Sequence, residues 1–381
     1  MWPLIILTII LLGGYILLIE NYRRWFLEVK PFSVPADFAP LLTFSIVISA
    51  RNEEAQIGKC LQSVLNQNYP SHLFEVIVVD DHSSDNTPVI VKKLQQKHSN
   101  LHIMNLEDLL QGQQLNSYKK KAIEFAIKQA KGDWILTTDA DCVIPNNWIK
   151  TFSAFIEERQ ALFVAAPVKF INTGSFISIL QCLDFMSLQG ITAASVNNRF
   201  HSMCNGANLA YNKKVFFEVG GFAGIDNIAS GEDMLLMYKV FLQHPRKVKF
   251  LLSHEVVTET LPMPDWKSFI NQRIRWASKA DKYDDKRIFA VLACVYLFNL
   301  SFLLLPFTWF WYPQGWILWL ILFVGKTFFE LRFLFPVARF YNEMKMLWWF
   351  PVMQPVHIWY TIIAGWLGKF GTYKWKGREV K

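Results

Sequence analysis

Hydrophobic residues form two patterns in this chain: long apolar runs near both ends, and short runs that alternate with polar segments between them. The first long run, Pro3 to Ile19, has about the length that spans a lipid bilayer. Two more, Ile288 to Tyr312 and Trp316 to Phe335, are separated by a short turn at residues 313–315. These runs predict an N-terminal transmembrane anchor and a C-terminal transmembrane hairpin.

Basic residues set the expected orientation of these segments. Arg23, Arg24 and Lys30 follow the first run, and basic residues favour the cytoplasmic side, so residues 31–287 are predicted to be cytoplasmic. A cleaved signal peptide is the alternative for the first run, but no basic residue precedes it and no small-x-small site follows it. We therefore expect a multi-pass protein of the inner (plasma) membrane with its active site on the cytoplasmic side.

The last apolar stretch, Met346 to Leu367, contains two prolines and is followed by a basic tail. A full span would place that tail outside, against the positive-inside rule, so a re-entrant or interfacial segment is favoured over a transmembrane one. In the hairpin, Lys326 and Glu330 are spaced to form an ion pair on one helix face.

Between the long runs, short β-branched segments alternate with segments of helical period. This pattern predicts repeated βα units on a mostly parallel sheet, with a first helix at about 54–67. The expected strands are residues 44–50, 74–80, 101–105, 134–138 and 162–169. The expected domains are an anchor at 1–30, an α/β domain at 31–262, an amphipathic interfacial helix at 263–287, a hairpin at 288–345, and a third apolar segment with its tail at 346–381.

Composition narrows the classes of partner. The chain is 52% hydrophobic with a formal net charge of +8, and its Lys and Arg residues cluster near the apolar runs. That distribution favours an anionic membrane face and argues against nucleic acid. The five cysteines show no CxxC spacing, which argues against a zinc site and a disulfide framework. Protein partners are not indicated.

Polar clusters follow three of the predicted strands: SARNEE at 49–54, DDHSSD at 80–85 and TDADC at 138–142. In an open parallel sheet, ligands bind beyond the carboxyl ends of the strands, so the three clusters predict one site. Acids at this edge would repel a diphosphate unless Mg²⁺ or Mn²⁺ came with it, a role that suits Asp139 and Asp141. The Asp80-Asp81 pair offers acceptors for a base or ribose, which indicates a nucleotide diphosphate as ligand.

An ordered set of motifs between residues 44 and 276 resembles family 2 of the inverting glycosyltransferases, in its membrane-embedded branch. The motifs are SARNEEAQIGKCLQSVLNQNYP, VIVVDDHSSDNT, KKKAIEFAIKQAKGDWILTTDADC, GANLAYNKKVFFEVGGF, GEDMLL and QRIRW. The resemblance implies a GT-A fold, which is Rossmann-like with a mostly parallel sheet, together with one N-terminal and two to three C-terminal transmembrane or interfacial helices.

The resemblance also implies roles for individual residues. Those assigned to the nucleotide-sugar donor are Arg51, Glu53, Asp80, Asp81 and Asp139, of which Asp81, supported by Asp80, contacts the nucleoside. Asp139 and Asp141 form the DxD motif that holds the divalent cation.

Acceptor-side roles follow from the later motifs. Asp233 of GED matches the general base, and Glu232 beside it orients the loop or the acceptor. Gln272, Arg275 and Trp276 match QxxRW and share one helix face at i, i+3 and i+4, where arginine can meet the diphosphate and tryptophan the acceptor sugar.

Some residues receive other interpretations. His82 stands where the family has a small residue such as glycine, a departure that bears on nucleoside recognition. Lys119 to Lys121 are expected to form a solvated face from which one lysine reaches the phosphates. Residues 206–208 are expected to form a close-approach wall beside the donor sugar or acceptor.

The sequence thus predicts an enzyme that transfers a sugar from a nucleotide diphosphate sugar, with UDP as the commonest carrier in this branch, to a lipid or lipid-linked saccharide. A processive polysaccharide synthase is the alternative, disfavoured because few helices are available to line a polymer channel. A non-catalytic nucleotide-binding membrane protein is a third possibility, which the complete set of acids and Arg275 argues against.

Overall fold

The computed structural model divides the chain into two compact units. The helical unit consists of residues 1–29, 171–201 and 262–381, and the α/β unit consists of residues 30–170 and 202–261. Residues 171–201 thus interrupt the α/β unit in sequence. The structure describes residues 2–110, 117–201, 203–225, 228, 230–279, 285–375 and 378–380.

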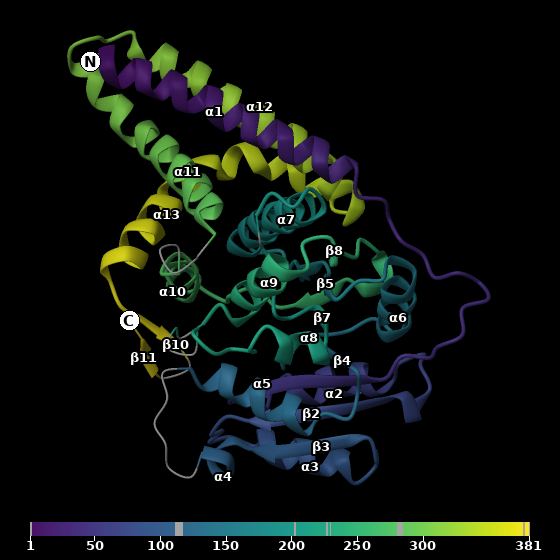
Figure 1. Cartoon of the computed structure of the whole chain (residues 1–381). Helices are drawn as coiled ribbons and strands as arrows, with labels where there is room; N and C mark the ends of the chain where they lie inside the picture. The colour runs from purple at the N-terminus through teal and green to yellow at the C-terminus, as the bar shows by residue number, and fades with distance from the viewer. Residues whose placement is uncertain are drawn as a thin grey trace. The chain divides into compact units, whose positions relative to one another are not determined.

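A seven-stranded mixed sheet forms the centre of the α/β unit (Figure 1). In spatial order its strands are β3 (Leu101–Asn105), β2 (Phe74–Asp80), β1 (Phe44–Ala50), β4 (Trp134–Thr137), β7 (Leu209–Asn212), β5 (Phe163–Ala165) and β8 (Val248–Phe250). The first four are mutually parallel, whereas β7 runs antiparallel to both β4 and β5. The predicted mostly parallel α/β sheet is confirmed.

Strand composition explains the sheet's position in the core. Every residue of β2 is buried, and β1 has one partly exposed residue, as expected for apolar, β-branched strands covered on both faces. The strand predicted at 162–169 is instead two strands, β5 and β6 (Val168–Phe170), because the chain leaves the main sheet at residues 166–167. There β6 pairs with β9 (Thr258–Thr260) in a second, two-stranded sheet.

Helices flank the strands of this unit. Their bounds are α2 (Ile57–Leu65), α3 (Thr87–Gln95), α4 (Leu106–Leu110), α5 (Tyr118–Gln129), α6 (Trp148–Arg159), α8 (Lys213–Glu218) and α9 (Glu232–Gln243). The first helix is shorter than predicted at both ends, but Ile57, Leu61 and Val64 form its buried face as their spacing indicates. Pro88 lies in the first turn of α3, where a missing N–H costs nothing.

The helical unit contains α1 (Trp2–Leu27), α7 (Phe176–Asn197), α10 (Trp266–Ala277), α11 (Lys286–Leu304), α12 (Gly315–Phe340) and α13 (Phe350–Phe370). A short hairpin, β10 (Tyr373–Trp375) and β11 (Arg378–Val380), follows α13. Helix α1 packs against α7, α11 and α12. Helices α7 and α12 approach closely at Gly190, where an added Cβ would lie 2.6 Å from a methyl group of Val337.

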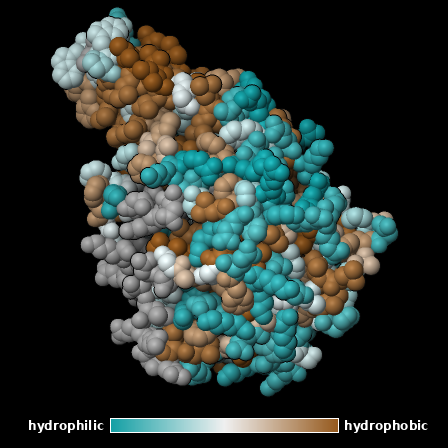
Figure 2. All heavy atoms as spheres, viewed as in Figure 1, coloured by the Kyte–Doolittle hydropathy of each residue, from teal (hydrophilic) through white to brown (hydrophobic). Residues whose placement is uncertain are grey.

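Within the residues that the structure describes, three helices are long and apolar enough to cross a membrane: α1, α7 and the segment Lys286–Phe310. Helix α7 was not expected among them, since its residues had been assigned to the cytoplasmic domain. The predicted second transmembrane arm, residues 316–335, lies on the continuous helix α12, which is not among these candidate spans. The expected Lys326–Glu330 pair is present on this helix at 2.6 Å. The stretch with two prolines is one helix, α13, because Pro351 lies in its first turn and Pro355 is accommodated inside. Figure 2 shows hydrophobic residues gathered over α1, α11 and α12.

Candidate functional site

Strand register brings four loops of the α/β unit to one edge of the sheet. Ala50 at the end of β1 lies opposite Asp80 at the end of β2, and Thr137 at the end of β4 lies opposite Val47. Because β7 is antiparallel, its first residue, Leu209, also lies opposite Thr137. The polar segments after β1, β2 and β4 and the loop before β7 therefore meet, and the expected common edge is present.

Asp80 and Asp81 occupy the β2 end of this edge and differ in their contacts. Asp81 is 1% exposed, its Oδ1 lies 2.8 Å from His82 Nδ1, and its carbonyl oxygen accepts a 2.9 Å hydrogen bond from Arg51 Nη1. Asp80 accepts from the Ser83 N–H at Oδ2, but its buried Oδ1 has no hydrogen-bond partner among the described residues. A buried acceptor without a donor is costly, so Asp80 Oδ1 is a position where a ligand N–H or O–H would be stabilised.

The backbone at His82 accounts for its unusual identity. His82 has φ 56, in the left-handed region where glycine is unstrained and other residues are uncommon. Its ring compensates by binding Asp81 and by meeting Tyr118 edge to face at 5.5 Å. Histidine in place of a small residue therefore keeps the turn, and its ring adds a contact to Asp81, which follows β2.

The segment after β1 is tied to the segment after β2 by short polar contacts. The Glu53 N–H donates to Thr87 Oγ1 at 2.8 Å, and Asn52 Oδ1 accepts from the Ser84 N–H at 2.8 Å. Because backbone groups of both loops take part, Glu53 is held beside the Asp80-Asp81 end of the site.

Lys119, in the first turn of α5, links two acids of the site. Its Nζ lies 2.8 Å from Asp139 Oδ1 and 3.1 Å from Glu232 Oε1. Burial opposes the charged form, but Asp139, Glu232 and Asp233 outweigh it and raise the pKa of Lys119. The predicted solvated face is wrong for Lys120, which is 2% exposed, with its ammonium bonded to the carbonyls of residues 228 and 230. Lys119 is the lysine of this run that pairs with site acids.

Asp233 and Glu232 are positioned by the start of α9. Gly231 precedes the helix with φ 82, a conformation that favours glycine, and places both acids in its first turn. The Gly206 N–H donates to Asp233 Oδ2 at 2.9 Å, and Thr137 Oγ1 donates to the Gly206 carbonyl at 2.7 Å. The loop before β7 thus holds Asp233 against the end of β4.

A small pocket of about 20 Å³ is lined by Lys119, Asp139, Gly206, Glu232 and Asp233, among others. It brings together an acid from each of two predicted motifs, DxD and GED, that lie more than ninety residues apart. We expected residues 206–208 to form one wall. Gly206 does so, but Asn208 is fully buried and bonds the carbonyls of residues 167 and 256, so its role is structural.

The second DxD acid, Asp141, is partly exposed, and Cys142 Sγ lies 3.5 Å from its Oδ1. Among the residues that the structure describes, no three His, Cys, Asp or Glu side chains are grouped to hold a metal by themselves. Mg²⁺ typically binds through one or two carboxylates and completes its shell with water and substrate phosphates. Two DxD carboxylates, with Asp139 38% exposed, fit that mode of binding.

The residues of QxxRW lie on α10 in the helical unit. Gln272 Oε1 accepts from Arg273 Nη1 at 2.6 Å, and the Arg273 guanidinium lies 4.2 Å from the ring centroid of Trp276. One face of Trp276 is therefore covered by Arg273, and Arg275 is partly exposed on the same helix.

Sequence reasoning missed the partner that orders α10. Arg273 donates to Asp184 Oδ2 from Nε at 3.0 Å and from Nη2 at 2.6 Å, a two-pronged contact with α7. The signal was available, because Asp184 is the single charged residue between Phe176 and Val196. A lone acid in an apolar stretch is a functional-site hypothesis in itself.

Comparison with known proteins shows which family residues 45–226 resemble. Residues 45–226 match the model of glycosyl transferase family 2. Poly(ribitol-phosphate) beta-N-acetylglucosaminyltransferase TarS of Staphylococcus aureus is 34% identical over 132 residues, which are 35% of this chain and 22% of TarS. Beta-monoglucosyldiacylglycerol synthase of Synechocystis sp. is 26% identical over 351 residues, which are 85% of this chain and 64% of that protein. This chain spans less than two thirds of the length of each.

Among solved structures, a mannosyltransferase of Pyrobaculum calidifontis in complex with GDP-Man and Mn²⁺ is similar with a TM-score of 0.60 at 15% identity. The likeness covers 96% of this chain and 99% of that one, and it supports the GT-A-like fold. Residues 45–226 are therefore similar to the family 2 glycosyltransferases, and the relatives that match this chain support a glycosyltransferase.

Proposed function

We propose that the chain transfers a sugar, with inversion, from a nucleotide diphosphate sugar to a hydroxyl of a lipid or lipid-linked saccharide. The observation that carries the proposal is the pocket lined by Asp139, Glu232 and Asp233, in which the ammonium of Lys119 pairs with Asp139 and Glu232. Inversion needs a carboxylate to take the proton of the attacking hydroxyl and positive charge to receive the leaving diphosphate, and both lie at this edge.

Asp233 is the general base of the proposal. Its carboxylate borders the pocket, and hydrogen bonds from the N–H groups of Gly206 and Met234, at 2.9 and 2.8 Å, fix its orientation. Glu232 is paired with Lys119, which leaves it the positioning role. A base of fixed orientation suits a reaction in which the attacking oxygen must approach from one side.

The donor is proposed to extend along the strand ends from β2 to β4. Asp80 Oδ1, buried and without a donor in the described part of the chain, would accept from the base or ribose, and Arg51 and Asp81 form the floor beside it. UDP is the carrier that the motif resemblance suggests. Asp139 and Asp141 would hold Mg²⁺ or Mn²⁺, which when bound neutralises the diphosphate.

The acceptor side is proposed to be the helical unit at a membrane. Three candidate spans support a membrane setting, and Arg23 and Arg24 at the end of α1 support a cytoplasmic active site in the plasma membrane. On this proposal Gln272, Arg275 and Trp276 of α10 serve the diphosphate and the acceptor.

The test is sugar transfer by the purified chain in lipid nanodiscs, with UDP-glucose and UDP-N-acetylglucosamine as donors. Asp233→Asn should lower turnover by about 100-fold or more, because the positioned base is lost. UDP binding should stay close to wild type, because the proposed contacts to the nucleotide are unchanged. Asp37→Asn, an exposed acid away from the site, is the matched control. Unchanged turnover in Asp233→Asn would remove Asp233 from this role.

Two further readouts separate the alternatives. EDTA should abolish transfer, and Mn²⁺ should restore it. Addition of single sugars to lipid supports the proposal, whereas a ladder of long products would identify a polysaccharide synthase. UDP binding without any turnover would favour a non-catalytic protein.

A further inference from the structure

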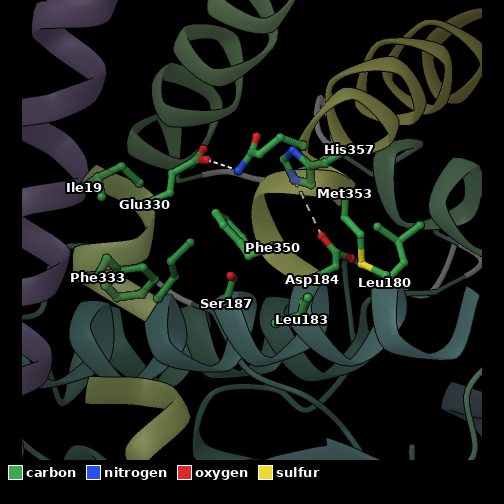
Figure 3. Close-up of a pocket in the computed structure, with 12 residues that line it drawn as sticks. Ile19, Leu180, Leu183, Asp184, Ser187, Glu330, Phe333, Phe350, Met353 and His357 are labelled. Carbon is green, nitrogen blue, oxygen red and sulfur yellow. Dashed lines mark hydrogen bonds and ion pairs between the residues drawn. The ribbon is translucent and has the colours of Figure 1, made fainter. Parts of the chain in front are cut away.

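A second cavity lies inside the helical unit, among α1, α7, α12 and α13 (Figure 3). Its volume is about 70 Å³, enough for several ordered waters or a small polar group, since a water needs at least roughly 10–15 Å³. Most of its wall is apolar, including Leu180, Leu183, Phe333, Phe350 and Met353. The same cavity carries five polar residues: Asp184, Ser187, Glu330, Gln354 and His357.

The acid on α12 is fully neutralised by its neighbours. Lys326 Nζ lies 2.6 Å from Glu330 Oε1 and 2.8 Å from Gln354 Oε1, and the lysine is 0% exposed. The Tyr15 hydroxyl donates to Glu330 Oε1, and Gln354 Nε2 donates to Glu330 Oε2. Since every one of these groups is satisfied within the network, Glu330 presents no free charge to the cavity.

The acid on α7 is neutralised as well. Arg273 binds Asp184 Oδ2 through two nitrogens, and the Tyr360 hydroxyl donates to Asp184 Oδ1. His357 Nε2 approaches the same Oδ1 at 3.7 Å. The two acids of the cavity are thus matched by two cations, Arg273 and Lys326, and the lining is close to neutral.

Hydrogen-bonding capacity remains on one side of the cavity. His357 Nδ1 is buried and has no partner among the described residues. Ser187 points from α7 into the same space in Figure 3. An imidazole nitrogen and a hydroxyl suit a hydroxyl ligand, which both donates and accepts. A lipid phosphate would instead meet two carboxylates whose cations are already engaged, and would remain uncompensated.

The surroundings of the cavity indicate how a ligand reaches it. The outer faces of α12 and α13 expose large apolar side chains, among them Phe328, Phe335, Val352 and Trp359. Contiguous apolar helix surfaces of this kind face lipid or protein and do not face water. A ligand from the lipid phase with a small polar head matches both the apolar wall and the neutral polar end.

We propose that this cavity binds the hydroxyl head of a neutral, glycerol-type lipid. The inference goes beyond the proposed function, since it adds a lipid site inside the helical unit and assigns it to neutral hydroxyl lipids in preference to lipid phosphates. Asp184 also connects the cavity to Arg273, and through it to Trp276, so the lipid site and the QxxRW helix share one ion pair.

The test measures lipid binding directly and does not require turnover. The full chain in phosphatidylcholine nanodiscs is photolabelled with a dioleoylglycerol that carries a diazirine near the glycerol, and labelled peptides are mapped by mass spectrometry. Labels should fall on α7 and α13. Unlabelled dioleoylglycerol should displace the probe, whereas a polyprenyl phosphate at the same concentration should not.

Variants make the assignment specific. Ser187→Leu fills the cavity and His357→Phe removes its free nitrogen, so each should lower labelling about tenfold. Ser187→Ala removes one hydroxyl without adding volume, and should lower labelling about threefold to fivefold even if the larger changes disturb folding. Gly325→Leu on α12 is the control, because an added Cβ there meets nothing within 4 Å.

Two results would overturn the inference: labelling that all three cavity variants leave unchanged, or stronger displacement by the polyprenyl phosphate. The readout also separates this inference from the proposed function. Labelling of the cavity in a wild-type chain that transfers no sugar would refute the function, and transfer to dioleoylglycerol with an unlabelled cavity would refute the site.

Discussion

Removing the positive charge of Lys119 tests the centre of the candidate site. In Lys119→Met the apolar stem is largely kept, but Asp139 and Glu232, which lie 2.8 and 3.1 Å from Nζ, lose their shared cation. The two carboxylates would then face the same pocket without compensation. The α/β unit should therefore be less stable, although methionine keeps most of the apolar contacts that the lysine stem makes.

The magnitude follows from burial. Removing one partner of a fully buried pair costs roughly 3–5 kcal/mol, whereas exposed pairs contribute about 0–1 kcal/mol. Lys119, Asp139 and Glu232 have side chains 23%, 38% and 11% exposed, which places this cluster between those limits. We expect a loss of about 2 kcal/mol, or a fall in Tm of about 4–8 °C for a domain of this size.

The assay is thermal unfolding of the purified chain followed by tryptophan fluorescence. Lys128→Met is the matched control, because Lys128 forms an exposed ion pair with Glu124 at 2.7 Å and should change Tm by less than about 2 °C. In the double variant Lys119→Met/Glu232→Gln, one uncompensated charge is gone. Its Tm should therefore be higher than the sum of the single effects predicts, by a coupling of about 1 kcal/mol.

The pH dependence has a defined sign. The pKa of Lys119 is raised by its acids, so its contribution is complete below the unfolded value of about 10.4 and is lost as pH rises through the higher folded value. The difference in Tm between wild type and Lys119→Met should thus be the same at about pH 7 and about pH 9. A Tm for Lys119→Met equal to that of Lys128→Met, or a difference that disappears by about pH 9, would refute the reasoning.

Other changes test separate parts of the structure. Gly190→Leu should lower Tm by several degrees, because its side chain would overlap α12, while Gly13→Leu, with open space around its Cβ, should not. His82→Val should cost about 1–2 kcal/mol and His82→Gly less, since a β-branched residue is strained at φ 56; unfolding curves of the two variants decide this. Burial raises the pKa of the Cys60 and Cys142 thiols, so iodoacetamide should modify neither in the folded chain at about pH 8 and both in denaturant; rapid labelling of the native chain would contradict their burial.

The sequence predicted the parts of this fold that depend on local periodicity. The first three strands begin and end at the residues expected, because each is a short apolar run bounded by polar or turn residues. Residues 162–169 were read as one strand because periodicity along the chain does not reveal where a strand leaves one sheet for another. The antiparallel direction of β7 was likewise invisible, as direction depends on the path of the chain and not on composition.

The candidate site was likewise predicted only in part from the sequence. Asp80, Asp81, Asp139 and Asp141 were found because they lie at or just after the ends of parallel strands, which share an edge, whereas Glu232 and Asp233 were found through the GED motif. The sequence did not show which lysine of the run 119–121 reaches the site. Such runs are usually solvated, and the acids that bind Lys119 are distant in sequence. Arg273 was overlooked for a related reason: it lies between the residues of a recognised motif, and its partner Asp184 is 89 residues away.

The order of elements along the chain has a consequence for biosynthesis. Helix α1 is made before the other helices of its unit, yet it packs on α12, and the Tyr15–Glu330 hydrogen bond joins residues 315 positions apart. The helical unit can therefore assemble only after residue 330 has left the ribosome, while the α/β unit is complete by residue 261. Before the helical unit assembles, Glu330 already has Lys326 one turn away on the same helix. The charge of Glu330 is therefore neutralised before α1 and α13 pack against α12.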